Sequence, residues 1–365
     1  YDFFSITEDE AEAFTQTPAV RDTVVIGSKG YPIMVILKGY VRDERSEHYY
    51  CRVLSGLSDY NLSVNADMTV SCNCKSRGGG LGNLREQTLE EIFDSERCRH
   101  LRSLLREGVL PTLCCLERCD DLVRSPLSVA RYYEEGYHVP PTIMFENTSI
   151  CNLRCDGCFN QYIPKVTVSI EDTERFAEEA AKHGIKKVYL FKYGEPFADR
   201  HIGEKLDIIK RRLPDAKIIT STNGLLLDSE ESREAALKFD FITFSLAGVD
   251  NETVTLFQKQ NNFDKVAENI SALAELKISR NLSRPVLMWK YVLFPGNDSD
   301  DCVNRAFEVS RRLKVNKLQF LSGFNTLNRS GVTWKSDVFL AYMKRYKFQW
   351  NANSGILTFE LTQVE

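Results

Sequence analysis

The sequence predicts an α/β protein in which helices cover the outside of a parallel sheet. From residue 142 onward, short runs rich in β-branched and aromatic residues alternate with amphipathic helical patterns. Counting the run that begins at Thr142, this alternation gives six βα units. The chain has 365 residues, of which 43% are apolar and 27% charged, a composition that supports two folded domains.

The predicted elements of this second half follow a regular order. The first helix begins at Ser169, a capping residue followed by the acidic pair Glu171 and Asp172. Parallel strands present their carboxyl ends at one edge of the sheet, which is where ligands bind. We expect strands at 142–149, 186–191, 216–221, 240–246, 285–294 and 315–321, and helices at 169–183, 199–212, 229–238, 262–277 and 298–313.

The first half is less regular. We expect a helix at 7–14, strands at 23–26 and 33–37, and a hairpin at 62–72 that turns at Asn65 and Asp67. A capping box at Thr88 predicts one helix from 88 to about 107, closed by Gly108 and Pro111. Residues 120–141 form a connector.

Charge and apolar patterning exclude several classes of protein. The 47 Lys and Arg residues are balanced by 51 Asp and Glu, so the net charge of −4 offers no basic surface for nucleic acid or acidic membranes. No apolar run approaches the roughly 18 residues of a membrane span, and the first residues do not resemble a signal peptide. Eleven cysteines without an export signal predict metal ligation in a reducing cytoplasm rather than disulfides.

Three cysteines, Cys151, Cys155 and Cys158, follow the first strand of the alternating half. Three thiolates on one loop can hold three irons of a four-iron, four-sulfur cluster and leave the fourth iron without a protein ligand. Such an open metal position is where a substrate or cofactor binds. The alternatives are unrelated buried thiols or a zinc loop, which needs a fourth ligand from Asp156 or a remote residue.

A second group of cysteines lies in the first half of the chain. Cys98 is in the middle of a predicted helix and, like Cys302, is expected to be a small buried apolar residue. The others can bind a second metal centre, either an iron–sulfur cluster or a zinc ion with four cysteine ligands. They are Cys51, Cys72, Cys74, Cys114, Cys115 and Cys119.

The triad and the strand ends together resemble the radical S-adenosylmethionine (radical SAM) enzymes. Lys192-Tyr193-Gly194-Glu195-Pro196 resembles that family's Gly-Gly-Glu-Pro segment, except that Tyr193 replaces the first glycine. The resemblance implies a partial (β/α)6 TIM-like barrel, a cluster held by Cys151, Cys155 and Cys158, and S-adenosylmethionine as cofactor. Glu195 would accept the ammonium of its methionine moiety.

Further cofactor-binding residues are implied by the same resemblance. Gly194 and Pro196 belong to the segment whose backbone contacts the methionine ammonium. The residues expected to bind the carboxylate and ribose of the cofactor are Ser221, Asn223 and Ser245, and Asn297 is expected to flank its adenine. Gly157 stands where the family commonly has an aromatic residue, and Phe159 would supply the missing ring.

The second group of cysteines, in the first half of the chain, resembles the SPASM or twitch auxiliary-cluster domain of the same family, through Leu81-Gly82-Asn83-Leu84 and Thr88-Leu89-Glu90-Glu91-Ile92. In the family this domain usually follows the barrel, whereas here it precedes it. The resemblance implies an auxiliary four-iron cluster held by Cys51, Cys72, Cys115 and Cys119, with Cys74 and Cys114 as alternative ligands. The expected division is an extension at 1–50, an α+β auxiliary domain at 51–125, the barrel at 142–322 and a C-terminal segment at 323–365.

The implied activity is reductive cleavage of S-adenosylmethionine to a 5′-deoxyadenosyl radical, with electrons from a flavodoxin- or ferredoxin-type donor. We expect the radical to abstract hydrogen from a small polar substrate of the sugar, aminocyclitol or nucleotide type, giving oxidation or isomerisation, because residues 1–50 are short for a leader-binding module. One alternative is a peptide maturase that forms a cross-link, a thioether or an inverted centre. The other is a non-catalytic, metal-stabilised binding protein. No catalytic side chain can be named from the sequence.

Overall fold

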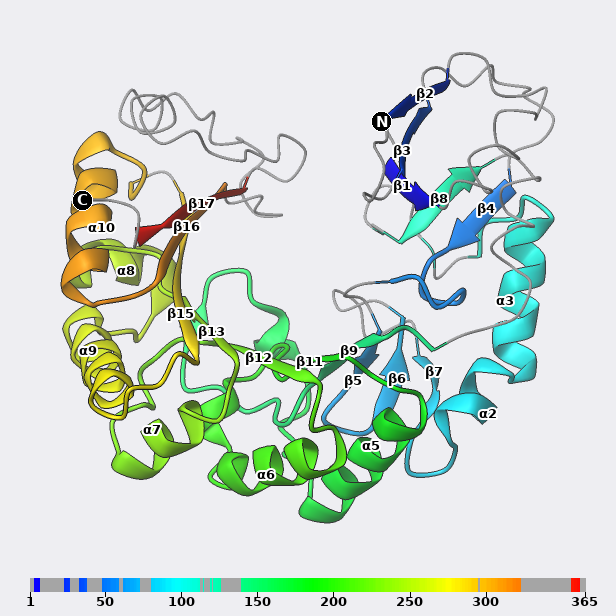
Figure 1. Cartoon of the computed structure of the whole chain (residues 1–365), viewed down its shortest axis with the longest axis horizontal. Coiled ribbons are helices and arrows are strands. Elements are labelled where there is room, and N and C mark those ends of the chain that lie inside the picture. Colours follow the sequence, from blue (N-terminus) through cyan, green and yellow to red (C-terminus); the bar gives the residue numbers. More distant parts are fainter. Residues whose placement is uncertain are drawn as a thin grey trace.

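The computed structural model describes residues 48–58, 62–72, 80–111, 114, 119, 121–125, 139–294, 296–322 and 361, together with the backbone of strands at 3–6, 23–26, 33–37 and 356–360. A curved sheet of ten strands organises this part of the chain, in the order β17-β16-β15-β13-β12-β11-β9-β5-β6-β7 (Figure 1). Its members are β5 (Ser63–Val64), β6 (Thr69–Ser71), β7 (Gly80–Asn83), β9 (Thr142–Phe145), β11 (Lys187–Tyr189), β12 (Lys217–Thr222), β13 (Phe241–Ser245), β15 (Val286–Leu293), β16 (Lys317–Ser322) and β17 (Ile356–Glu360).

Six neighbouring strands, from β9 to β16, run parallel, and helices follow them on the outer side of the curve (Figure 1). The predicted α/β class and partial barrel are therefore confirmed, with the described strands forming an open sheet rather than a closed barrel. The helices are α5 (Ile170–Lys182), α6 (Ile202–Arg212), α7 (Glu230–Ala236), α8 (Asn251–Phe257), α9 (Phe263–Ser279) and α10 (Asp300–Arg312).

The core lies between the sheet and these helices. Phe145 of β9 stacks on Phe176 of α5 with ring centroids 3.9 Å apart, and Trp289 of β15 packs against Phe263 of α9. Both strand residues are fully buried. Because side chains alternate along a strand, the residues next to them in sequence, such as Met144 and Lys290, lie on the opposite, concave face.

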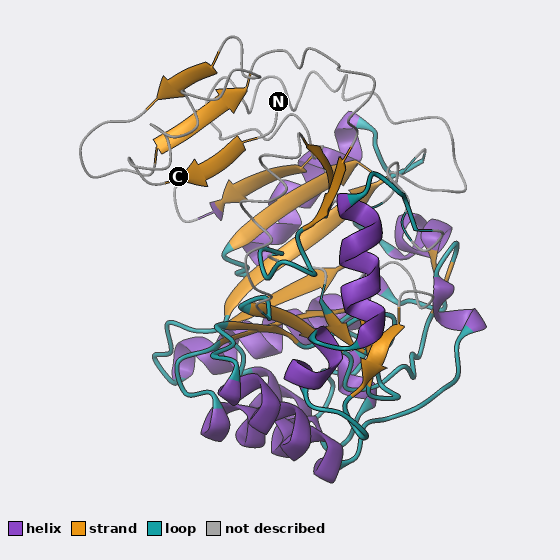
Figure 2. Cartoon of the chain, turned by 90° about the vertical axis from the view of Figure 1, so that its right-hand side faces the viewer, coloured by secondary structure: helices purple, strands orange, loops and turns teal. Residues whose placement is uncertain are grey.

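The N-terminal half contributes strands to the same sheet. β5 pairs parallel to β9, with Ser63 opposite Met144, and β6 and β7 continue antiparallel beyond it. A two-stranded ladder then brings β4 (His48–Cys51) beside β8 (Leu122–Ser125), and α2 (Leu89–Phe93) and α3 (Glu96–Arg106) follow β7. Figure 2 views the sheet from the side of α3. Strands β5, β6 and β7 thus continue the barrel sheet, while the division of the chain into domains stays a prediction.

Polar contacts fasten this N-terminal part to the barrel. The Glu146 carboxylate after β9 accepts hydrogen bonds from the backbone amides of Ala66 (3.2 Å) and Tyr193 (3.1 Å). Arg85 forms a bidentate ion pair with Asp172 of α5, the shortest contact being 2.7 Å. A buried, hydrogen-bonded carboxylate and a two-pronged ion pair both fix orientation, so the two halves are held in one arrangement.

Several predicted elements need correction. The single helix expected at 88–107 is wrong: it is divided into α2 and α3, because Ser95 accepts a hydrogen bond from the Cys98 amide and so caps a new helix. The helix expected from 199 begins at Ile202 instead, after the short 3₁₀ helix η2 (Pro196–Ala198). The strand expected at 142–149 ends at Phe145.

Other features were missed or lie elsewhere. The sequence reading missed α8 and the short strand β14 (Gln258–Lys259) that follows it. The strands at 23–26 (β2) and 33–37 (β3) are confirmed, and they pair with an unexpected β1 (Phe3–Ile6) in the order β1-β3-β2. The helix expected at 7–14 lies outside the described residues. Within the described part of the chain, none of the helices combines the length and the apolar character needed to cross a bilayer.

Candidate functional site

The cysteine loop, residues 151–158, begins at the carboxyl end of the first barrel strand. Its middle forms β10 (Arg154–Cys155), which pairs with β14 so that Cys155 lies opposite Gln258. The Asp156 amide also donates to the Phe257 carbonyl oxygen at 2.9 Å, and Gly157 takes the left-handed conformation at φ +74°. The loop that carries the triad is therefore anchored to a segment from a distant part of the chain.

The three thiols lie in one partly buried place. Burial raises the pKa of Cys151 to about 11, aided by the nearby Glu195 and Cys158. Burial, together with Cys158 and Cys151, raises the pKa of Cys155 to about 12. Backbone amides approach two of the sulfurs, Leu153 N to Cys151 Sγ and Asn160 N to Cys158 Sγ, each at 3.5 Å. Thiolates here need positive charge beside them, which iron ions supply.

This arrangement fits a cluster better than isolated structural thiols. All three cysteines are free and half-buried, so they are open to a ligand on one side. Within the described residues, no three Cys, His, Asp or Glu side chains, the triad included, are arranged closely enough to hold one metal ion. The fit of a four-iron cluster therefore rests on the shared loop, on the closeness of cysteines whose thiolate forms would repel one another, and on the backbone amides near two of the sulfur atoms.

Gly194 lies where the cysteine loop meets the segment after β11. A Cβ atom at this position would be 2.0 Å from the Thr148 carbonyl oxygen and 2.9 Å from that of Ile150. Only glycine allows such a close backbone approach. The Glu195 amide donates to the Ile150 carbonyl oxygen at 2.8 Å, so the backbone of 194–195 lies directly against the start of the cysteine loop.

Glu195 is a buried carboxylate at the centre of the site. Its oxygens accept hydrogen bonds from the Thr222 hydroxyl (2.7 Å), the Asn223 amide (2.8 Å) and the Phe197 amide (3.2 Å). Burial nevertheless raises its pKa from 4.5 to about 7. Because the carboxylate form is disfavoured on folding, this group costs the folded chain up to about 3 kcal/mol as pH rises from 4.5 through 7. A cation bound beside Glu195 would offset that cost.

Asn223 links the carboxylate to the cysteine loop. Its side-chain amide donates to Asn152 Oδ1 at 2.8 Å, while its oxygen accepts from the Leu225 amide at 3.0 Å. The end of β12 is thereby joined both to Glu195 of the neighbouring strand end and to the residue that follows Cys151. Three segments that are far apart in sequence meet at this asparagine.

Ser221 and Ser245 lie side by side on the concave face, their hydroxyl oxygens 2.9 Å apart. The backbone after Ser245 is held by Gln258, whose amide donates to the Ser245 carbonyl oxygen (2.8 Å) and whose oxygen accepts from the Ala247 amide (2.9 Å). Gln258 also faces Cys155 in the β10–β14 ladder. One buried glutamine therefore connects the cysteine loop to the end of β13.

Two other predicted cofactor residues have different environments. Asn297 is buried, and its side chain is used by the backbone: it donates to Ala247 and Val292 carbonyl oxygens, both at 2.9 Å, and accepts from the Phe294 amide. This makes it a residue that positions the loop between β15 and α10. Phe159 is exposed and meets Tyr193 edge to face, with ring centroids 6.3 Å apart.

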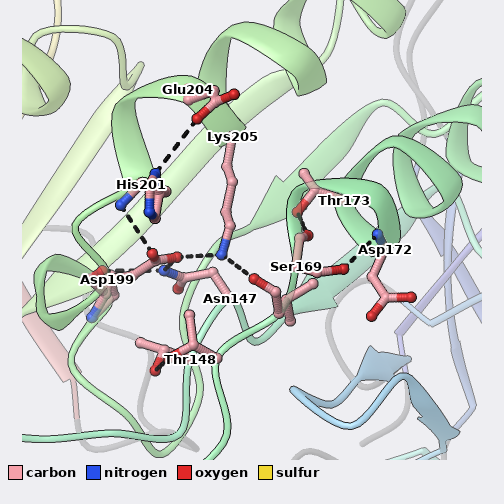
Figure 3. A network of polar contacts seen from close by, with 12 residues as sticks. Asn147, Thr148, Ser169, Asp172, Thr173, Asp199, His201, Glu204 and Lys205 are labelled. Atoms are coloured by element: carbon pink, nitrogen blue, oxygen red, sulfur yellow. Dashed lines mark hydrogen bonds and ion pairs between the residues drawn. The ribbon is translucent and has the colours of Figure 1, made fainter.

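A buried polar network of Asn147, Asp199 and Lys205 (Figure 3) contacts the backbone at Pro196. Lys205 pairs with Asp199 at 2.5 Å, and both side chains are completely buried. The Asn147 amide donates to Asp199 Oδ2 and to the Pro196 carbonyl oxygen, both at 3.1 Å. Such a paired and hydrogen-bonded charge is tolerated in a core and fixes the geometry of the strand end above it.

The N-terminal cysteines converge as well. Burial raises the pKa of Cys51 well above its usual value and that of Cys72 to about 12, and Cys114 and Cys119 add to both increases by electrostatic repulsion. Cys51, Cys72, Cys114 and Cys119 therefore lie near one another. Cys74 and Cys115 lie outside the described residues, so the choice between Cys114 and Cys115 stays a prediction. Cys98 and Cys302 are buried, as expected.

Sequence reasoning missed the residues that hold the site together. Asn160 donates to the carbonyl oxygens of Ser149 (2.7 Å) and Tyr193 (2.9 Å), and Glu146 and Gln258 make the links described above. None of them carries a local signal, because each acts on backbone groups that are distant in sequence. The polar residues at the strand ends were the only available signal for this neighbourhood.

A cysteine triad at the carboxyl edge of an open parallel barrel, beside a buried carboxylate and polar strand ends, defines a class of cluster-dependent enzymes. Residues 146–329, half of the chain, match the Radical SAM superfamily. The chain belongs to this superfamily, whose members are enzymes. The family implies a 4Fe–4S cluster and S-adenosylmethionine as cofactors.

Named relatives match only part of the chain. A GTP 3′,8-cyclase from Chlorobaculum tepidum is 29% identical over 128 residues, which cover 34% of this chain and 38% of the cyclase. The tungsten-containing aldehyde ferredoxin oxidoreductase cofactor-modifying protein of Pyrococcus furiosus is 31% identical over 114 residues, 28% of this chain and 30% of that protein. The chain thus spans well under half the length of these relatives.

The chain also aligns with parts of solved structures. The chain aligns with native anSMEcpe carrying bound AdoMet at a TM-score of 0.38 and 21% identity, over 49% of this chain and 50% of that one. It aligns with Streptococcus suis SuiB bound to S-adenosylmethionine at a TM-score of 0.42 and 16% identity, over 62% of this chain and 51% of that one.

Proposed function

We propose that this chain binds a four-iron cluster through Cys151, Cys155 and Cys158 and cleaves S-adenosylmethionine reductively. The observation that carries the proposal is the convergence at Asn223, which joins the cysteine loop to the buried Glu195. When bound, the cluster supplies the electron that converts the cofactor to methionine and a 5′-deoxyadenosyl radical.

Different residues of the chain would bind different parts of the cofactor or position the loops around it. Glu195 would accept a hydrogen bond from the ammonium of the methionine moiety, because its three present donors are neutral and leave the buried carboxylate without a counter-charge. The backbone of Gly194 and Pro196 would contact the same moiety, and Ser221 and Ser245 offer adjacent hydroxyl groups on the next strands of the sheet. Asn297 would act by positioning the loop after β15.

The substrate of our proposal is a small polar metabolite, whose hydrogen is abstracted to give oxidation or isomerisation. A similarity to GTP 3′,8-cyclases, which act on a nucleotide by their name, supports this class. The likeness of residues 51–119 to auxiliary-cluster domains favours a peptide maturase as the second candidate. The proposal includes the auxiliary cluster, held by Cys51, Cys72, Cys115 and Cys119, with Cys74 and Cys114 as alternative ligands.

The test is an anaerobic assay of the reconstituted chain with S-adenosylmethionine and a chemical reductant. We expect 5′-deoxyadenosine to form, and Glu195→Gln to weaken binding of the cofactor by roughly tenfold, since a charge-assisted hydrogen bond is replaced by a neutral one. Absence of 5′-deoxyadenosine from protein with a full iron complement would overturn the proposal. The rate of cofactor cleavage is then measured with GTP added and with a pool of peptides added. The addition that accelerates cleavage indicates the substrate class.

A further inference from the structure

Lys290 of β15 is a charged residue that the proposed cofactor site does not use. It alternates with Trp289 and Tyr291, which are fully buried against the helices, so its side chain belongs to the concave face of the barrel. In the sheet register it lies between Ser245 of β13 and Gln319 of β16. It therefore stands on the inner wall, near the carboxyl end of its strand.

The ammonium of Lys290 has no hydrogen-bond or ion-pair partner among the described residues. Burial lowers its pKa, and no neighbouring charge counteracts that effect. The two carboxylates at this edge of the sheet, Glu146 and Glu195, are engaged with amides and hydroxyls elsewhere. An unpaired ammonium surrounded by protein is costly, and it is retained where a ligand supplies the missing anion.

Other lysines of the described part are differently placed. Lys192 donates to Asn65 Oδ1 at 2.5 Å, and Lys205 pairs with Asp199 in the core. Lys187, on the same concave face but at the opposite end of its strand, lies 5.8 Å from the Tyr189 ring centre. Lys290 is thus a cation at the ligand-binding edge whose surroundings provide hydroxyls but no anion.

Distance separates Lys290 from the proposed position of the methionine moiety. Glu195 follows β11, and three strand spacings lie between β11 and β15 in the order β11-β12-β13-β15. At about 4.8 Å per spacing, Lys290 is about 14 Å from that strand along the sheet. An amino acid end of the cofactor bound at Glu195 and the cysteine loop is therefore too far away to supply an anion to Lys290.

We propose that Lys290 binds an anionic oxygen group, phosphate or carboxylate, of the substrate. The inference rests on the proposed function, because it assumes that the cofactor occupies the Glu195 side of the barrel. It narrows the substrate from a small polar metabolite to an anionic one. Lysine is a compact point charge that suits either group without requiring a fixed geometry.

Lysine acetylation of the cluster-loaded chain tests this directly. A soluble N-hydroxysuccinimide ester labels accessible amines, and peptide mass spectrometry reports Lys290 and Lys187 in the same sample. The probes are inorganic pyrophosphate, GTP and succinate at millimolar concentration, each with S-adenosylmethionine present, and potassium chloride at equal ionic strength controls for screening. We expect at least one probe to lower labelling of Lys290 by about fivefold and leave Lys187 unchanged, the behaviour of a site nearly saturated by a millimolar binder.

Three results would overturn the inference. If Lys290 is not labelled in the free protein, solutes cannot reach it. If Lys290 is labelled and no anionic probe reduces the labelling, it does not lie in an anion-binding site. Protection by S-adenosylmethionine alone assigns Lys290 to the cofactor carboxylate instead of the substrate. If the inference holds, the Lys290→Met variant should bind the protecting probe roughly tenfold more weakly than the unmodified chain does. The matched control, Lys187→Met, should bind it as tightly as the unmodified chain. Because none of these readouts needs cofactor cleavage, a failure of the proposed chemistry is seen separately, in the 5′-deoxyadenosine assay.

Discussion

The two cysteine groups differ in how their members come together. Cys151, Cys155 and Cys158 lie within eight residues of one loop, whereas Cys51, Cys72, Cys114 and Cys119 come from segments spread over 69 residues. The first group lies beside Glu195 and the polar strand ends. In the second, Cys72, Cys114 and Cys119 pack against the hydrophobic core. Of the two, the first has the surroundings of a ligand-binding centre.

This difference suggests that the two cysteine groups have different functions. Polar groups that converge on the triad can orient a cofactor. Apolar surroundings raise the cost of unpaired thiolates and favour a metal centre that is closed by protein ligands. We therefore expect the N-terminal group to influence stability or electron transfer and the barrel group to determine cofactor cleavage.

Replacing single cysteines of the two groups should give the largest effects, on 5′-deoxyadenosine formation and on iron content. Cys155→Ala should reduce 5′-deoxyadenosine formation to background, because the cluster would lose one of its three ligands. Cys119→Ala should remove about four irons per chain but retain cofactor cleavage. Cys302→Ala, a buried cysteine outside both groups, is the control and should keep iron and activity. Cleavage that persists in Cys155→Ala would show that the triad is misassigned.

Substitution at Gly194 tests how tightly the barrel site is built. Gly194→Ala places a methyl group 2.0 Å from a backbone oxygen, which nothing nearby can relieve without moving the cysteine loop. We expect a loss of about 2–4 kcal/mol in unfolding free energy, measured by urea denaturation of the metal-free chain, and impaired cluster assembly.

Gly203 provides the matched control because it lies in α6, and the nearest atom to an added Cβ is 3.6 Å away. Gly203→Ala should raise stability by about 0.5–1 kcal/mol, as alanine favours the helix. Equal effects of the two substitutions would contradict the close approach at Gly194.

Removing the Arg85–Asp172 ion pair should have the smallest effect on stability. It tests how the N-terminal part of the chain, which carries the second cysteine group, is held to the barrel. Arg85 is 47% exposed and Asp172 only 12%, so solvent screens the pair in part. A double-mutant cycle with Arg85→Ala and Asp172→Ala should give a coupling of about 1 kcal/mol, measured by denaturation. A coupling near zero would leave the N-terminal strands held mainly by the β5–β9 ladder and Glu146.

Much of the fold followed from local pattern. Apart from α8 and β14, the order of strands and helices from 142 to 322 was predicted correctly, as were the strands at 23–26 and 33–37, since each depends on periodicity or spacing within a few residues. The break at Ser95 and the late start of α6 at Ile202 were missed, because capping by Ser95 and the Asp199–Lys205 pair decide them. These contacts leave only weak traces in the sequence.

By itself the sequence determined the alternating α/β architecture, the triad, and which strand ends carry polar groups, because these are short-range features of composition and spacing. The tertiary structure decided that β5 joins the barrel sheet beside β9, that Gln258 joins the cysteine loop to β13, and that Lys290 faces the concave side with no partner among the described residues. Each of these depends on pairing between residues far apart in the chain. Such contacts are selected by the packing of the whole sheet and not by local preference.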